Sequence, residues 1–233
     1  MTGTESAIVG IRRATTHRDD PRPKTPLELG AEAAVDLLEA TGVSRDQVGA
    51  LFTGRTPQAY MTLQYSQGLL NELKLAPTFS SEVTSHGGGA LGTLQMAALA
   101  VNSGVIDYAL CVTNEAGGAW INMATANATW EGDLQFEAPY GTSTPSLYAN
   151  AVSRYVYEYG ATAEMAARVA VENRRWALHH PLAAMRHATA PTSAPTRLRL
   201  PACRCSYSTA APRPPLPAAV DEQSASAGAA IVS

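Results

Sequence analysis

The chain has 233 residues, a formal net charge of −3 and 45% hydrophobic residues. This length is sufficient for one sizeable core, and the near-neutral charge excludes the strongly basic surface of a typical nucleic-acid-binding protein. Residues 97–112 form the longest apolar stretch, but polar residues interrupt it and it is too short to span a bilayer. Three cysteines and no secretory signal predict a cytoplasmic protein with reduced thiols.

The opening of the chain is predicted to be β-α-β. An apolar run at residues 7–11 is typical of a buried strand. A helix then begins where Thr25 and Glu28 form the pattern of a capping box, and Gly42 supplies its left-handed end. The apolar residues 50–53 predict the next strand.

The alternation of helices and strands continues through the middle of the chain. We expect a helix within residues 61–74, a strand at 79–84, a glycine turn at 85–89, a helix at 90–102 and a strand at 108–112. This order predicts an α/β fold with an αβα layered arrangement. The helix after Gly89 has few bulky or charged residues, so we expect it to lie deep inside the fold, packed on all sides.

The second half of the chain is less regular. Residues 115–145 show no clear period, a length of irregular chain that is typical of a functional loop or lid. Two helices are predicted next, one from Thr144 to Tyr159 and one from the cap Thr162 to His179.

Residues 187–233 are expected to form an irregular Pro/Ala-rich tail. Its composition fits either a disordered tail or a reading-frame slip in a GC-rich gene. The last residues, 228–233, again have the pattern of a strand. Cys203 and Cys205 lie in this tail without partner ligands, so we expect no metal site.

Residues 85–104 and the strand that follows resemble the nucleophile turn, buried helix and next strand of the thiolase superfamily, in particular its sterol-carrier or lipid-transfer branch. Further segments have the family's order and spacing: residues 113–115, 139–141, 155–160, 173–177 and 180–181. The resemblance covers most of residues 5–185. It implies that residues 1–186 form a thiolase-like N-terminal half-domain with a mixed sheet, without the C-terminal half that completes the family's active site.

The alignment with the family places its nucleophilic cysteine at Gly87. In such a turn, backbone amides and the positive end of a helix dipole favour a thiolate and hold a carbonyl oxygen. Glycine has no nucleophile, so thiolysis through an acylated cysteine is not expected here. Cys111 lies in the middle of an apolar strand, where core packing is expected.

Candidate site residues each have two interpretations. His86 either polarises a thioester or acts as a base, or it forms a hydrogen bond that holds the turn in shape. Gly88 and Gly89 are expected to bind substrate through their amides. Tyr140 lines an acyl pocket or belongs to the core, and Glu115 orients a neighbouring group or is structural. The adjacent arginines on the last helix contact CoA phosphates or form a solvated face, namely Arg174 and Arg175.

The resemblance implies a protein that handles acyl-CoA, either acyltransferase-like or a retro-aldolase acting on a CoA thioester. It implies no cofactor beyond the CoA ester, an acyl- or steroid-CoA substrate, a homodimer and a small OB-type partner subunit. The alternatives are a non-catalytic lipid- or acyl-CoA-binding subunit and a nonfunctional fragment.

Overall fold

The computed structural model of the chain describes residues 6–16, 20–57, 64–115, 133, 135–136, 144–181, 183 and 225–233. It divides into two compact units, one formed by Met1–Ile121 with Ser224–Ser233 and one by Asn122–Gln223. No helix among the described residues is long and apolar enough to cross a membrane.

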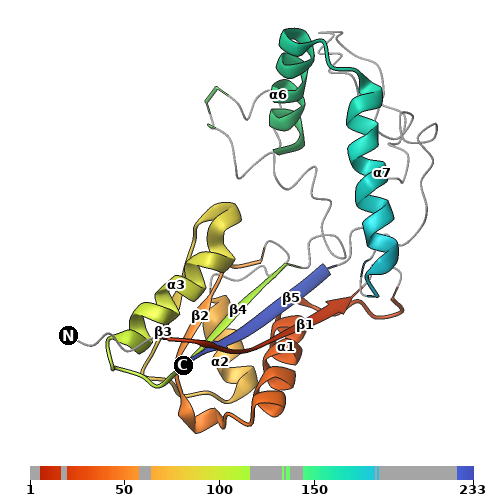
Figure 1. The fold of residues 1–233 in the computed structure, drawn as a ribbon. Coiled ribbons are helices and arrows are strands. Elements are labelled where there is room, and N and C mark those ends of the chain that lie inside the picture. The colour runs from red at the N-terminus through yellow and green to blue at the C-terminus, as the bar shows by residue number, and fades with distance from the viewer. Residues whose placement is uncertain are drawn as a thin grey trace. The chain divides into compact units, whose positions relative to one another are not determined.

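The first unit is built on one mixed five-stranded sheet in the order β1-β5-β4-β2-β3. Its strands are β1 (Ile8–Thr16), β2 (Val48–Thr53), β3 (Phe79–Glu82), β4 (Tyr108–Glu115) and β5 (Ala225–Val232). Strands β2, β3 and β4 run parallel, whereas β5 is antiparallel to both β1 and β4. Figure 1 shows the last strand of the chain lying between the first strand and β4. The predicted α/β class and mixed sheet are confirmed.

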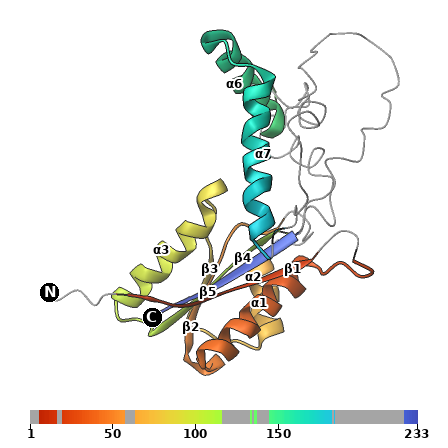
Figure 2. The ribbon, with the colours of Figure 1, turned by 45° about the vertical axis from the view of Figure 1, so that its right-hand side comes forward.

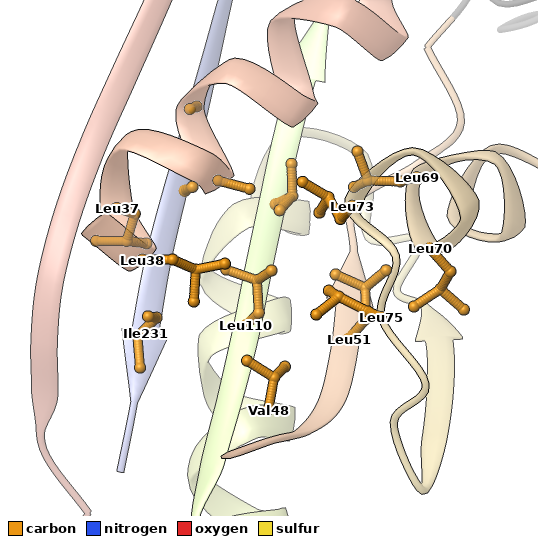
Figure 3. Packing of buried hydrophobic residues seen from close by; sticks show 14 of the residues in the cluster. Leu37, Leu38, Val48, Leu51, Leu69, Leu70, Leu73, Leu75, Leu110 and Ile231 are labelled. Atoms are coloured by element: carbon orange, nitrogen blue, oxygen red, sulfur yellow. The ribbon is translucent and has the colours of Figure 1, made fainter. Parts of the chain in front are cut away.

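Helices cover both faces of this sheet (Figure 2). On one face lie α1 (Pro26–Thr41) and α2 (Tyr65–Leu73), which bury a leucine-rich core against β2, β4 and β5. Figure 3 shows leucines of α1 and α2 meeting Leu51, Leu110 and Ile231 of the strands. On the other face α3 (Gly89–Asn102) packs over a second cluster that contains Phe52, Ala97 and Cys111.

The ends of α1 follow the predicted local chemistry. Thr25 accepts a hydrogen bond from the Glu28 amide, and the Glu28 carboxylate accepts one from the Thr25 amide, so the capping box is complete. Gly42 ends the helix with φ 72°, a left-handed conformation that favours glycine. The described part of the first unit also contains two short 3-10 helices, η1 (Arg45–Gln47) and η2 (His86–Gly88).

The expectation that α3 lies deep inside the fold is wrong. Its buried residues recur at every fourth position, namely Gly89, Thr93, Ala97 and Val101. This spacing places one narrow stripe against the sheet. Larger apolar side chains lie on the outer side, where Leu91 is 73% and Leu99 is 58% exposed. The small residues thus allow a close approach to the sheet on one side only.

The end of the chain is part of the sheet. The strand predicted at 228–233 is confirmed and begins earlier, at Ala225. Its residues pair with β4 on one side and β1 on the other, and Ile231 is fully buried. The first unit therefore includes these last residues, whereas the proposed domain boundary at residue 186 and the irregular part of the tail lie outside the described residues.

The second unit contains the two predicted helices, α6 (Thr144–Tyr159) and α7 (Ala163–His179). The Thr162 hydroxyl caps α7 by accepting a hydrogen bond of 3.3 Å from the Met165 amide. On α6, an exposed ion pair joins Arg154 and Glu158 at a spacing of four residues.

Candidate functional site

The glycine turn lies at the carboxyl end of β3. Strand β3 ends at Glu82, and the chain passes through residues 83–85 and η2 into α3. Because β3 and β4 both run parallel to β2, the same edge of the sheet carries residues 54–56 after β2, the turn after β3, and Glu115 at the end of β4. This edge is where open α/β sheets commonly bind ligands.

The turn leaves the start of α3 without a side-chain cap. Gly88 is the N-cap residue, with φ −89° and ψ 0°, and as a glycine it has no side chain to accept a hydrogen bond from the first helical amides. The Gly88 amide itself donates to the Ser85 carbonyl oxygen at 2.8 Å. Of the amides expected to bind substrate, this one therefore already has a partner. The exposed Gly87 and the uncapped first turn of α3 remain as the positive end of the helix dipole.

The backbone conformation does not require a glycine at position 87. A Cβ atom built at this position meets no atom of the described residues within 4 Å, and the φ of Gly87 lies outside the left-handed region. A side chain would therefore fit at Gly87 without strain. The absence of a nucleophile at position 87 therefore reflects the residue type, glycine, and not a lack of space for a side chain.

Cys111 does not replace the missing nucleophile. It lies within β4 with 4% of its surface exposed, and its thiol donates to the Thr93 carbonyl oxygen at 3.6 Å. Burial raises the pKa of the Cys111 thiol to about 12. At neutral pH the side chain is a protonated thiol and a poor nucleophile. The prediction that Cys111 packs in the core is confirmed.

A carboxylate clamp holds the segment that follows β2. The Glu82 carboxylate accepts hydrogen bonds from the Thr56 amide at 2.8 Å and from the Thr56 hydroxyl at 2.7 Å. It joins the ends of the adjacent strands β2 and β3 next to the glycine turn. The sequence analysis missed this pair, because only the parallel pairing of the two strands brings together residues that are 26 positions apart.

A pocket of about 150 Å³ lies beside the first two turns of α3. Its walls come from α3 and from residues of β1, β4 and β5. The sequence analysis did not predict it, since β5 is contributed by the distant end of the chain. The pocket starts three residues after Gly87, at Ala90.

The predicted site residues are only partly described. Glu115 is the last residue of β4 and is half-buried opposite Ser226 of β5. His86 begins η2, but its side chain lies outside the described part of the chain, as does all of Tyr140. Among the described residues no group of three or more potential ligands is placed to hold a metal ion.

The two arginines lie on α7 of the second unit. Arg175 is exposed and makes an ion pair with Glu172, with 3.4 Å between Nη1 and Oε2. This ion pair on the exposed side of α7 agrees with the solvated-face interpretation of Arg175.

Curated relatives share sequence with most of the chain, although no protein-family model matches it. A steroid side-chain-cleaving aldolase of Thermomonospora curvata is 31% identical over 188 residues, 76% of this chain and 46% of the aldolase. A 17-hydroxy-3-oxo-4-pregnene-20-carboxyl-CoA lyase of Mycobacterium tuberculosis is 32% identical over 191 residues, 78% of this chain and 48% of the lyase. The benzoylsuccinyl-CoA thiolase subunit BbsB of Thauera aromatica is 31% identical over 159 residues, 66% of this chain and 40% of BbsB.

Solved structures agree in fold. The Ltp2-ChsH2(DUF35) aldolase superposes with a TM-score of 0.64 and 24% identity, covering 98% of this chain and 55% of the matched chain. The human mitochondrial 3-ketoacyl-CoA thiolase superposes with a TM-score of 0.61 and 12% identity, covering 98% of this chain and 64% of the thiolase. The chain spans about half the length of the curated aldolase and lyase. By sequence and by fold, this chain is a thiolase-like protein.

Proposed function

We propose that this chain takes part in carbon–carbon bond cleavage of the retro-aldol type on a CoA thioester, without a covalent acyl-enzyme. The observation that carries the proposal is the glycine turn at α3. The turn places the positive end of the α3 helix dipole at the carboxyl edge of the sheet. However, Gly87 has no thiol, and the thiol of Cys111 is buried and protonated.

A retro-aldol step needs no nucleophile. A base removes the proton from the β-hydroxyl group of the substrate, and the bond between the α- and β-carbons breaks. The electron pair moves to the α-carbon and forms the thioester enolate, and the β-carbon leaves as a carbonyl compound. Protonation of the enolate then gives a shorter acyl-CoA. In this proposal amides at the start of α3 stabilise the enolate oxygen, and His86 supplies the base.

The other predicted residues have supporting roles in the proposal. Glu115, at the adjacent strand end, orients a neighbouring group, and Tyr140 contacts the acyl part of the substrate. Gly87 and Gly88, which are both exposed, let the thioester approach the backbone closely. These roles are proposed for a chain that spans about half the length of its aldolase and lyase relatives.

The relatives also suggest substrate and partner. Two are named for cleavage of a steroid side chain or a steroid-related CoA ester, and one solved relative is named as an assembly of two proteins. On this basis we propose a steroid- or acyl-CoA substrate and a small OB-type partner subunit. The homodimer and the cytoplasmic location are proposed from the sequence alone.

Non-catalytic binding of acyl-CoA is the second candidate function. It is favoured by the apolar pocket beside α3, which offers a binding surface but no reactive group. A binding subunit of this kind would retain the fold and the pocket and would need no reactive side chain at position 87.

The test incubates the purified chain, in the presence and absence of an OB-type partner, with each of two substrates. One is a β-hydroxyacyl-CoA with a tertiary alcohol, and the other is a β-ketoacyl-CoA with free CoA. We expect release of a ketone from the first and no thiolysis of the second. His86→Ala should abolish ketone release, whereas Ser103→Ala, at the other end of α3, should not. Thiolysis would contradict the proposal, and binding without turnover would favour the second candidate.

A further inference from the structure

Gly92, the fourth residue of α3, packs against the segment that leads from β3 into the glycine turn. A Cβ atom built at position 92 would lie 3.0 Å from Cγ1 of Val83 and 3.7 Å from Oγ of Ser85. Carbon atoms that are not bonded to each other prefer a separation of about 3.5–4.0 Å. A side chain at position 92 would therefore force the helix and Val83 apart by about half an ångström.

Val83 is held in place from the side of the sheet. Its amide donates a hydrogen bond of 2.8 Å to the Thr53 carbonyl oxygen at the end of β2. The residue before it, Glu82, is bound to Thr56 through its carboxylate. The Val83 side chain packs against the second hydrophobic cluster, and a β-branched side chain has little freedom about χ1. A side chain at position 92 would therefore meet a neighbour that is fixed by its backbone and by its packing.

The start of α3 is the partner that can move. Gly87 and Gly88 are exposed, and the N-cap residue Gly88 offers no side chain to hold the first amides. From Thr93 onward the helix is fixed by residues buried against the sheet, among them Ala97. A separation imposed at position 92 is therefore taken up by the residues that precede Thr93. Their amides are the groups that the proposed function directs at the enolate oxygen.

We propose that Gly92 is a positioning residue, whose missing side chain lets the start of α3 lie close enough to Val83 for its amides to reach the thioester oxygen. The inference rests on the proposed function and assigns a role to a residue outside the glycine turn. Gly92 touches no reacting atom and acts through the placement of the amides before it. Since a misplacement of about 1 Å can cost a hundredfold in rate, half an ångström should cost about tenfold.

The test compares two reactions of a thiol introduced by Gly87→Cys, in a chain that also carries Cys203→Ser and Cys205→Ser. With acetyl-CoA, the thiolate at position 87 attacks the carbonyl carbon, the bond from that carbon to the CoA sulfur breaks, and CoA leaves as its thiolate. Negative charge develops on the carbonyl oxygen, so the rate depends on the amide donors. With iodoacetamide, the same thiolate displaces iodide from a saturated carbon, and no oxyanion forms. Alkylation therefore measures the reactivity of the thiol without the amide donors.

Addition of Gly92→Ala should slow acetylation about tenfold and change alkylation by less than about twofold. Further addition of Val83→Ala removes the Cγ atoms that the new Cβ atom meets, so acetylation should return to within about twofold of the parent rate. Gln95→Ala is the matched control, because it introduces the same residue at an exposed position of α3 and should alter neither rate. In the chain that retains Gly87, Gly92→Ala should lower kcat for ketone release and leave KM nearly unchanged.

Three results would overturn the inference and leave the proposed function standing. One is equal acetylation with and without Gly92→Ala, and another is an equal slowing of acetylation and alkylation. The third is acetylation that stays slow after Val83→Ala is added. If the Gly87→Cys parent were alkylated but not acetylated, the turn would not hold a thioester carbonyl, and both the inference and the proposed function would fail.

Discussion

The buried hydroxyl of Tyr65 on α2 donates a hydrogen bond of 2.6 Å to the side-chain oxygen of Asn114 on β4. The amide nitrogen of Asn114 donates in turn to the Pro26 carbonyl oxygen, at 2.5 Å, in the first turn of α1. These two bonds tie α1, α2 and β4 together at the carboxyl end of β4, one residue before Glu115. Tyr65, which is 1% exposed, therefore helps to fix the edge of the sheet at which the candidate site lies.

Tyr65→Phe should lower the free energy of unfolding by about 1 kcal/mol, because the half-buried side-chain oxygen of Asn114 loses its donor. Urea unfolding followed by circular dichroism measures the change. Tyr157→Phe is the matched control, since Tyr157 is 84% exposed and its hydroxyl lies in the second unit. Equal stability of wild type and Tyr65→Phe would show that this hydrogen bond contributes nothing.

Gly30→Ala should destabilise the fold although alanine is the better helix former. A Cβ atom at position 30 of α1 would overlap the Tyr65 hydroxyl oxygen. We expect a net loss of about 1–2 kcal/mol, because overpacking outweighs the gain in helix propensity of about 1 kcal/mol. In the Tyr65→Phe background the hydroxyl is absent, so the same substitution should become neutral or stabilising. A double-mutant cycle measures this, and additive effects would contradict the predicted overlap.

Cys111 predicts a loss of stability at high pH. Its pKa in the folded protein is raised to about 12 from an ordinary value of 9.0, so the folded state holds its proton when the unfolded state has lost it. The stability that the neutral thiol provides is complete below pH 9 and is lost as pH rises from 9 toward 12.

The difference should reach about 2 kcal/mol near pH 10.5, at about 1.4 kcal/mol per pH unit. Urea unfolding of wild type and Cys111→Ala between pH 8 and 10.5 separates this effect from the ionisation of other groups. The wild type should lose more stability than the variant over this range. Parallel curves would mean that the thiol is not buried as described.

Much of the fold follows from local sequence patterns. The capping box at Thr25, the glycine end at Gly42 and the strand pattern at 228–233 each depend on a few adjacent residues, and each is confirmed. The site was predicted less completely. The Glu82–Thr56 clamp, the Tyr65–Asn114 bond and the pocket depend on strand order, which brings distant segments together and leaves no local signal. The exposed outer side of α3 was also missed, because small residues predict close packing but not on how many sides.

The turn at α3 should lower the pKa of a thiol placed in it. Gly87→Cys adds a side chain into open space at the positive end of the helix, and Ser103→Cys places the same thiol at the exposed C-cap of α3. With Cys203 and Cys205 changed to serine, iodoacetamide should alkylate Cys at 87 at a lower pH than at 103, with pKa values about one unit or more apart. Identical pH profiles would show that the helix start has no electrostatic influence at position 87.

The central claim is that the glycine turn faces the thioester carbonyl but lacks a group to attack it. Incubation with acetyl-CoA, followed by intact-mass measurement, tests this most directly. In the Gly87→Cys variant the new thiolate attacks the acetyl carbonyl and CoA leaves as its thiolate, so the protein should gain one acetyl group. Wild type and Ser103→Cys should stay unmodified under the same conditions. Acetylation of the wild type, or equal labelling of the two cysteine variants, would contradict the account.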